Sequence, residues 1–244
     1  KSEFVFVVIN KSENDNYKIL YSGSIPLSGI IETKIMDLES IHNLLREKIY
    51  LIEKEINFIF KDVTLIIDNF DCSFINLCGL KKLNGTQLTK ENITYILNSL
   101  KSQVNDFEPT KEIIQIFNCK FFLDNKKIEN IPVGLFGDNY LHELSFILLK
   151  KNDYKNLKNI LNKCNLKITK IYSKNFISGV ETIKKNTGLE TFLKIEINSN
   201  DSKIIFFEDS ALKFVQEFNF GSDIILQDIS KVTGLRNKNV EDVL

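Results

Sequence analysis

The sequence contains no apolar run that approaches the roughly 18 residues of a membrane-spanning helix. It also lacks an excess of charge, because 32 Lys and Arg residues balance 32 Asp and Glu residues. A balanced chain has no global basic field to attract nucleic acid or acidic lipid. The composition therefore gives no indication of a membrane span and none of a nucleic-acid partner.

Cysteine and histidine are scarce. The 4 cysteines include no C-x-x-C pair, and neither of the 2 histidines lies at zinc spacing from another His or Cys. We therefore expect reduced thiols in a cytoplasmic protein, no disulfide framework and no metal site. His42 and His142 both fall within predicted elements, and we expect structural or surface roles for them.

The strong catalytic motifs are missing as well. The sequence has no G-x-S-x-G, no Walker loop and no H-E-x-x-H. Asp68, Asp71 and Glu143 could suggest acid–base chemistry, but nothing in the sequence brings two of these carboxylates together. Enzyme classes that depend on such motifs are therefore not supported.

What is present is the composition of a folded protein. Hydrophobic residues make up 43% of the 244 residues and charged residues 26%, a balance typical of globular domains. A chain of this length can bury a core without disulfides or metal. It begins at Lys1, without Met and without a signal peptide, and we expect an internal fragment of a longer protein.

The first part of the chain has the pattern of a mixed α/β sheet. Near-continuous apolar runs predict strands. Apolar residues spaced three and four apart after Asp37, a predicted N-cap, predict a long helix. The predicted strands cover residues 4–9, 17–22, 30–35 and 63–67.

A self-contained β-α-β pattern follows, and a second α/β segment comes after it. In the former, Thr89 is the predicted N-cap of a helix that ends near Val104, with strands at residues 74–83, 113–117, 120–123 and 141–149. In the latter, Asp153 and Ser222 are predicted caps. The predicted strands there are residues 166–172, 192–197, 202–207 and 212–220, and the helices begin at Asp153, Asn175 and Asp223.

This order of elements is similar to that of the actin-like (ribonuclease H-like) nucleotide-binding fold. In that α/β fold, ATP lies between two similar halves that each open with a β-hairpin. The hairpin turn is rich in glycine, so that backbone N–H groups can approach the phosphates. Residues 192–207 occupy the place of the second such hairpin.

Several segments resemble the bacterial cell-division family FtsA in particular. Residues 131–137, IPVGLFG, are similar to the family pattern N-P-[IV]-G-[LM]-x-G, and residues 37–41 match D-[LIV]-E-x-[IV]. The other similar segments are residues 84–93, 152–168 and 221–229. Because the resemblance runs nearly from end to end in the order of the family, the chain is identified as FtsA-like.

The resemblance implies a chain in three parts. Residues 1–68 and 150–188 would form the first actin-like subdomain, and residues 69–149 a small inserted β-α-β subdomain of the FtsA type. Residues 189–244 would be the truncated start of the second actin-like subdomain. The strands at 63–67 and 166–172 should then share one sheet.

The resemblance also implies a function. FtsA proteins are cytoplasmic scaffolds, peripheral to the inner membrane at the division site, that link the FtsZ ring to that membrane. The implied partners are FtsZ, later division proteins and further copies of the protein in filaments. In the family, the FtsZ-binding subdomain and the membrane-targeting C-terminal helix lie beyond the segment matched here.

The hairpin turn departs from the family pattern D-I-G-G-G-T-x-D. Glu196 falls on the first Asp, Asn198, Ser199 and Asn200 fall on the three glycines, and Asp201 falls on the Thr. These residues are degenerate phosphate-loop positions with two open interpretations: an ordinary polar turn or a loop that still holds a nucleotide. Glu196 is likewise either a strand-end carboxylate or a metal ligand.

We expect no cofactor and no ATPase activity in this chain, because the resemblance implies that the first phosphate loop and most of the second half of the cleft lie outside it. The replaced glycines are a separate argument against enzymatic activity. ATP with Mg²⁺ stays an open alternative for the complete protein. Two other functions also remain: an ATP-binding, actin-like ATPase such as a sugar kinase or chaperone, and a pilus-assembly binding protein of the PilM type. The segment at 131–137 favours FtsA over both.

Overall fold

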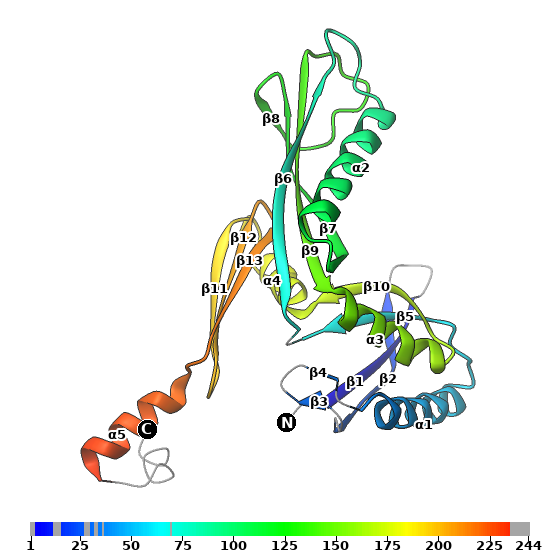
Figure 1. Ribbon diagram of the computed structural model, residues 1–244, viewed down its shortest axis with the longest axis vertical. Coiled ribbons are helices and arrows are strands. Elements are labelled where there is room, and N and C mark those ends of the chain that lie inside the picture. Colours follow the sequence, from blue (N-terminus) through cyan, green and yellow to red (C-terminus); the bar gives the residue numbers. More distant parts are fainter. Residues whose placement is uncertain are drawn as a thin grey trace. The chain divides into compact units, whose positions relative to one another are not determined.

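The computed structural model describes the chain except for residues 1–2, 12–15, 27–29, 32–33, 36, 69 and 235–244. The described residues form helices and β-sheets that divide into two compact units (Figure 1). The first unit contains Lys1–Cys72, Thr110–Ile114 and Leu149–Tyr172, and the second contains Ser73–Pro109, Gln115–Leu148 and Ser173–Leu244. In the described part, no helix is both long and apolar enough to cross a membrane.

The first unit combines short sheets with two helices. β1 pairs antiparallel with β2, β3 pairs antiparallel with β4, and β5 lies beside β10 in a two-stranded sheet. The last pairing confirms that residues 63–67 and 166–172 share one sheet. The elements are β1 (Glu3–Lys11), β2 (Tyr17–Pro26), β3 (Ile30–Ile31), β4 (Lys34–Ile35), α1 (Leu38–Ile56), β5 (Asp62–Ile67), α3 (Lys151–Lys163) and β10 (Lys167–Ser173).

Helix α1 begins where the sequence predicts. The Asp37 carboxylate accepts hydrogen bonds from the backbone N–H groups of Glu39 (3.1 Å) and Ser40 (3.0 Å), which caps two amide groups that have no partner within the helix. The hydrogen bonds from Ser40 lower the pKa of Asp37. At the other end, Asn57 takes the left-handed conformation (φ 55°) and ends the helix.

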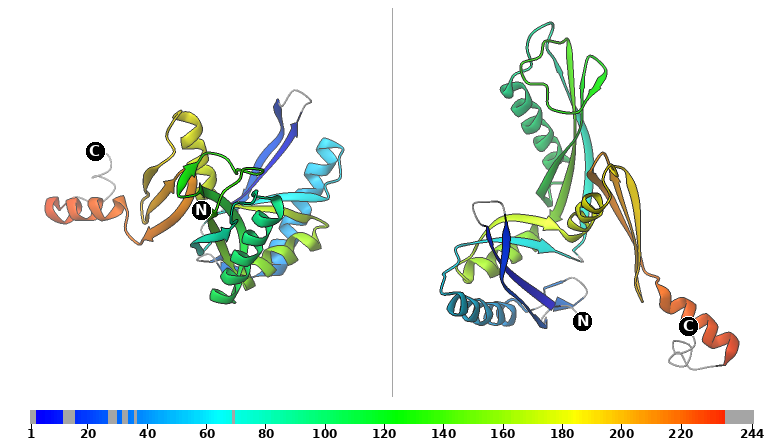
Figure 2. Two further views of the ribbon diagram at one scale, coloured as in Figure 1. Left: turned by 90° about the horizontal axis from the view of Figure 1, so that it is seen from above. Right: turned by 180° about the vertical axis from the view of Figure 1, so that it is seen from behind.

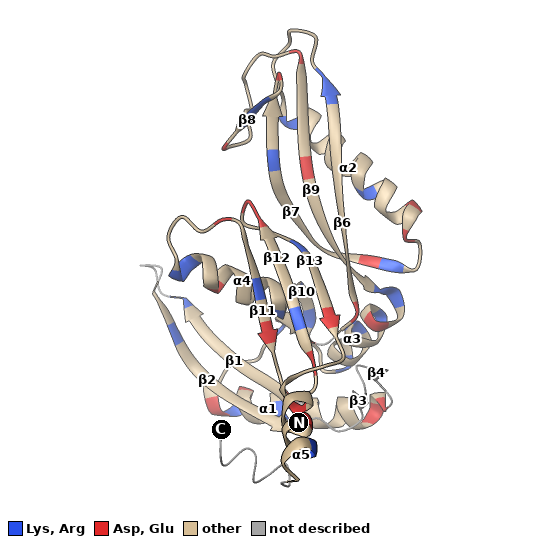
Figure 3. Ribbon diagram, turned by 90° about the vertical axis from the view of Figure 1, so that its left-hand side faces the viewer, with Lys and Arg blue, Asp and Glu red and all other residues tan. Residues whose placement is uncertain are grey.

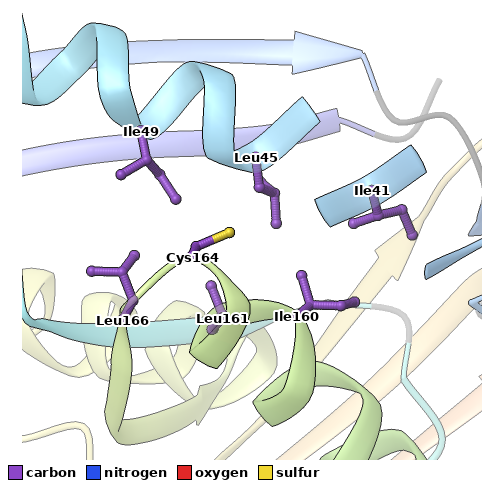
Figure 4. Packing of buried hydrophobic residues seen from close by; sticks show 7 residues of the cluster. All are labelled: Ile41, Leu45, Ile49, Ile160, Leu161, Cys164 and Leu166. Carbon is purple, nitrogen blue, oxygen red and sulfur yellow. The ribbon is translucent and has the colours of Figure 1, made fainter. Parts of the chain in front are cut away.

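The core of the first unit forms where α1 packs against α3 (Figure 4). The apolar residues of α1 recur on one helical face and meet Ile160 and Leu161 of α3, with the Cys164 side chain between the two helices. Burial of these side chains is the main term that stabilises such a contact. The buried residues of this cluster are Ile41, Leu45, Ile49, Ile160, Leu161, Cys164 and Leu166.

The second unit contains a four-stranded sheet of order β6-β9-β7-β8. Helix α2 lies along one face of this sheet, as the views in Figures 1 and 2 agree. Gly79 of β6 permits the close approach, because a Cβ there would collide with Ile96 of α2. The elements are β6 (Cys72–Lys82), α2 (Lys90–Phe107), β7 (Lys111–Leu123), β8 (Lys126–Ile128) and β9 (Asn139–Lys150).

The second unit also contains a three-stranded antiparallel sheet of order β11-β12-β13 with two helices. Gly179 of α4 allows the Phe207 ring to pack directly on the helix, since a Cβ at that position would overlap the ring. The Phe207 ring also stacks on Phe192, with centroids 4.9 Å apart. The elements are α4 (Lys174–Lys185), β11 (Phe192–Ile197), β12 (Ser202–Glu208), β13 (Ala211–Phe218) and α5 (Ser222–Thr233).

Three details of the sequence prediction were wrong. The strands expected at 113–117 and 120–123 are one continuous strand, β7. Helix α3 begins at Lys151 without a side-chain cap, and Asp153 lies inside its first turn. The N-cap of α5 is Gly221 rather than Ser222.

The predicted division into three parts stays a prediction. The two units observed have different boundaries, since α4 belongs with the β11–β13 sheet in the second unit. A fourth expectation, a single strand at 30–35, was wrong as well, because β3 and β4 are two short strands that pair antiparallel with each other, while residues 32–33 lie outside the described chain.

A larger side chain at position 179 should destabilise the second unit. The substitution Gly179→Leu forces Phe207 away from α4, and overpacking of this kind costs about 1–3 kcal/mol. The free energy of unfolding, measured by urea titration of the purified chain, should fall by that amount. Glu181→Ala, at an exposed position of the same helix, is the matched control and should change it by less than about 0.5 kcal/mol. Equal stability of the two variants would contradict the packing described.

Candidate functional site

The candidate phosphate turn is closed by its own hydrogen bonds. β11 and β12 pair up to Ile197 opposite Ser202, and residues 198–201 connect them. The backbone N–H of Asn198 donates to the Asp201 carbonyl oxygen at 2.9 Å, and its Nδ2 donates to Asp201 Oδ2 at 2.9 Å. Residues 198–201 are not among the described residues with positive φ, so this turn has no backbone geometry that requires glycine.

The carbonyl groups of the turn point at the N-terminus of α5. The N–H of Ser222 donates to the Asn198 oxygen and the N–H of Asp223 to the Ser199 oxygen, both at 2.9 Å. Gly221 makes this contact possible, because a Cβ there would overlap both carbonyl groups. A helix N-terminus often binds an anion through such N–H groups. Here the turn itself occupies two of them.

A further contact fixes the turn against the segment before α5. The buried Ser202 hydroxyl donates to the Phe220 carbonyl oxygen at 2.7 Å. Asn198, Ser199 and Asn200 keep exposed side chains. The turn is therefore attached through its backbone, while the side chains that replace the family glycines face solvent.

Glu196 lies one residue before the turn and has a cationic partner. Its Oε1 is 2.7 Å from Lys194 Nζ on the same strand, and Lys194 also donates to the Ser178 hydroxyl of α4. Among the described residues, no cluster of three or more His, Cys, Asp or Glu could hold a metal ion. The contacts of Glu196 favour the strand-end carboxylate over the metal ligand, and its site role stays a prediction.

The Lys203 side chain is paired with a glutamate on the neighbouring strand. Its register partners are Glu196 on β11 and Glu217 on β13, so the three side chains form a row on one face of the sheet. The Lys203 side chain is buried, with Nζ 3.1 Å from Glu217 Oε1. A lysine near the turn could offset the negative charge of Asp201 and Glu196. Lys203, however, is held in an ion pair with Glu217.

Two of the three carboxylates considered for acid–base chemistry, Asp71 and Glu143, form ion pairs with lysines. In the first unit, Asp71 lies 2.7 Å from Lys150 Nζ. In the second unit, Glu143 is paired with Lys213.

The far end of the hairpin carries an ion-pair network that the sequence did not indicate. The Lys213 side chain on β13 is 6% exposed, contacts Glu143 of β9 and lies 3.7 Å from Glu208 of β12. Lys120 of β7 lies 3.1 Å from Glu208 and 3.5 Å from Asp209. Glu143 and Lys213 are 70 positions apart, so no local pattern could have linked them.

Burial and pairing act in opposite directions on these lysines. Burial is the largest single influence on Lys213 and lowers its pKa, but the hydrogen bond and charge of Glu143 together with the contact of Cys119 outweigh it, so the net pKa is raised. Lys120 shows the same balance through Glu208. Both lysines therefore stay charged at neutral pH, and the network joins the β12–β13 end of the hairpin to the sheet that carries α2 (Figure 3).

The two histidines have structural contacts. The His142 ring is buried, with Nε2 2.9 Å from Asn118 Oδ1, and burial lowers its pKa to about 4. His42 Nε2 lies 3.3 Å from the Lys163 carbonyl oxygen. The contacts agree with the structural roles expected from the sequence.

Loss of the buried lysine charge should cost more than loss of an exposed one. Lys213→Met leaves the partly buried Glu143 (17% exposed) without its partner, a change worth about 3 kcal/mol of unfolding free energy. Lys231→Met breaks a surface pair with Asp228, whose side chains are 75% and 67% exposed, and should cost about 0–1 kcal/mol. Urea unfolding of both lysine variants gives these losses, and adding Glu143→Gln alone and combined with Lys213→Met gives the coupling energy of the Glu143–Lys213 pair. Similar losses for the two lysine variants would argue against the network.

Three comparisons with known proteins bear on this chain. No protein-family model matches it. It is 21% identical over 232 residues to "Cell division protein FtsA" of Buchnera aphidicola subsp. Acyrthosiphon pisum (strain APS), a match that covers 94% of this chain and 54% of the relative. It is 22% identical over 219 residues to the protein of the same name from subsp. Schizaphis graminum (strain Sg), covering 89% of this chain and 51% of the relative. The chain thus spans about half the length of the curated relatives it matches.

A solved structure supports the fold. A chain of the "PilM-PilN type IV pilus biogenesis complex" superposes with a TM-score of 0.53 at 12% identity, covering 99% of this chain and 65% of that one. At this identity the similarity shows the fold alone. The α/β, actin-like fold expected from the sequence is confirmed, as is the resemblance to the curated FtsA relatives.

Proposed function

We propose that this chain, which is FtsA-like and has the actin-like fold, belongs to a cell-division scaffold. The complete protein would link the FtsZ ring to the inner membrane and recruit later division proteins. It would be cytoplasmic and would associate peripherally with that membrane at the division site. Its partners would be FtsZ, other division proteins and further copies of itself in filaments.

The observation that carries this proposal is the extent of the sequence match. Both curated relatives bear the name cell division protein FtsA, and the match to the first covers 94% of this chain. The match therefore includes the region of the four-stranded sheet and α2, which corresponds to the inserted subdomain expected from the FtsA resemblance. Membrane attachment would come from a C-terminal helix in the part of the relatives that is not matched.

A PilM-like binding protein is the second candidate, since the fold similarity extends over 99% of the chain. Fold similarity at 12% identity does not separate the two functions. The curated sequence matches, at 21% and 22% identity, are both to FtsA. They favour the division scaffold.

Recruitment of FtsZ polymers tests the scaffold. The complete protein should carry polymerised FtsZ from the same organism to vesicles of phosphatidylethanolamine and phosphatidylglycerol in a flotation assay. FtsZ without the protein should stay in the lower fraction. Failure of the folded, vesicle-bound protein to bring FtsZ upward would refute the proposed link.

We further propose that the nucleotide site is degenerate and that the scaffold has no ATPase activity. The turn replaces glycines with Asn198, Ser199 and Asn200, and Asp201 and Glu196 add negative charge beside a site for a polyanion. Two helix N–H groups that could hold phosphate already bind the turn. Filament formation would then not depend on ATP.

Restoring the family turn should strengthen ATP binding by the complete protein. The quadruple variant Asn198→Gly, Ser199→Gly, Asn200→Gly and Asp201→Thr removes side chains and one charge. Loss of two or three phosphate hydrogen bonds, each about 1.5–3 kcal/mol, corresponds to several powers of ten in Kd. Calorimetric titration with Mg·ATP should show the unaltered protein binding far more weakly than the variant.

The control for this titration is Ser210→Gly, at the opposite end of β12. Ser210 has φ 63°, so glycine is tolerated there without strain. The control should leave ATP affinity unchanged. Low-micromolar binding of ATP by the unaltered protein would contradict the degenerate site.

A further inference from the structure

A groove lies between strand β6 and helix α2 in the second unit. A cavity of about 180 Å³ opens between residues 78–80 of β6 and the side chains of Tyr95, Ser99 and Gln103, which follow one another along α2. Its floor is apolar, because the fully buried Ile96 and Leu100 of α2 line it from below. The groove thus has a strand as one wall and a helix as the other.

β6 forms the border of its sheet. It stands at the end of the order β6-β9-β7-β8, and in the described chain no strand pairs with its outer edge. The strand is 11 residues long, contains no proline and carries charge only at its end, in Lys81 and Lys82. Proline, bulges or inward-facing charges usually protect such an edge from pairing with another chain. β6 contains no proline, and its only charged residues, Lys81 and Lys82, lie at one end.

Gly79 shapes the groove. It sits midway along its walls, and the missing side chain lets α2 approach until Ile96 contacts the strand. Figure 3 shows β6 at the sheet border with α2 beside it. An extended segment laid along β6 would therefore meet backbone groups of the strand and side chains of the helix at the same time.

The mouth of the groove carries a positive charge. Lys81 Nζ lies 4.8 Å from the centroid of the Tyr95 ring, close enough for a cation–π interaction. The Tyr95 side chain at the rim is 62% exposed. The surface thus combines apolar contacts with a cation that can pair with a carboxylate.

We propose that this groove binds an extended peptide segment with an apolar side chain and a nearby acidic residue. The peptide backbone adds to β6 as a further strand, the apolar side chain enters the cavity between the β6 backbone at Gly79 and the Tyr95 side chain, and the acidic residue pairs with Lys81. Strand addition supplies affinity through the main chain and specificity through side-chain pockets. At about 180 Å³ the cavity accommodates one side chain, and it is smaller than the roughly 300–1,000 Å³ of small-molecule sites.

This inference rests on the geometry of the second unit and goes beyond the scaffold role, because it names a class of partner and the surface that binds it. A second copy of the chain, paired edge to edge through β6, is the competing occupant. The binding experiment described next distinguishes a peptide partner from a second copy of the chain.

The test uses defined peptides and the whole chain. The probe is a fluorescein-labelled octapeptide of alternating valine and threonine that ends in two aspartates, and a second probe carries the aspartates at its start, since either strand direction is allowed. Fluorescence anisotropy should show saturable binding of one probe below millimolar concentration. The same peptide with alternate backbone nitrogens methylated should not bind, because strand addition requires those N–H groups.

Two variants test whether the peptide binds in this groove, and a third serves as a control. Ser99→Phe fills the cavity and Lys81→Glu reverses the charge at its mouth, and each should weaken binding about tenfold or more, or 1.4 kcal/mol. Lys126→Glu makes the same charge change at an exposed position on the opposite border strand, β8, and should leave the affinity unchanged. Thermal unfolding verifies that each variant is folded, and Lys81→Glu, on the surface, keeps the test valid if Ser99→Phe does not fold.

Three results would overturn the proposal. One is the absence of saturable binding by both probes. Another is binding that methylation and Lys81→Glu leave intact. The third is a concentration-dependent dimer in sedimentation velocity that Ser99→Phe abolishes, which would assign the edge to a second copy. None of these results depends on FtsZ recruitment, so failure of this inference is distinct from failure of the scaffold.

Discussion

The N-terminus of helix α5 must satisfy backbone N–H groups that have no partner inside the helix, and the way it does so determines the candidate site. Carbonyl oxygens of Asn198 and Ser199 accept the hydrogen bonds of Ser222 and Asp223. The turn is thereby drawn onto the helix, and Gly221 is the residue that allows the contact. A helix N-terminus that could have attracted phosphate is used to hold the protein's own backbone. In this account, the hairpin keeps the shape of a nucleotide-binding element while its hydrogen-bonding groups serve the fold.

The opposite end of the hairpin is fixed by charge rather than by backbone. Lysines from β7 and β13 alternate with Glu143, Glu208 and Asp209, and the most buried of them, Lys213, depends on Glu143 for its charge partner. Strand β12 is therefore held at both ends. Backbone hydrogen bonds attach the turn before it to α5, and the ion-pair network attaches its other end to the four-stranded sheet. Removal of one buried partner leaves an uncompensated charge, which is why such a network sets position more firmly than exposed ion pairs do.

The sequence predicted those features of the fold that depend on residues close together in the chain, such as helix caps and apolar spacing. Asp37 and the helical spacing of apolar residues placed α1, and the apolar runs that became β5 and β10 were correctly expected in one sheet. The sequence analysis expected separate strands on either side of Asn118 and Cys119, but cross-strand contacts, including Cys119 Sγ to Ser145 Oγ at 3.0 Å, continue β7 there. Residues 196–201 were recognised only through family resemblance, and their attachment to α5 was not predictable, because it depends on a contact some twenty residues away along the chain. The Glu143–Lys213 pair joins still more distant positions.

Amide hydrogen exchange at Ser222 and Asp223 tests the central claim most directly, because it reports on the two hydrogen bonds that attach the turn to α5. Both amides should exchange slowly in the complete protein, with no change when Mg·ATP is added. Amides at the first turn of a helix exchange rapidly when they lack acceptors. Rapid exchange that becomes slow only on addition of Mg·ATP would show that phosphate, not the turn, is their partner, and would contradict the account.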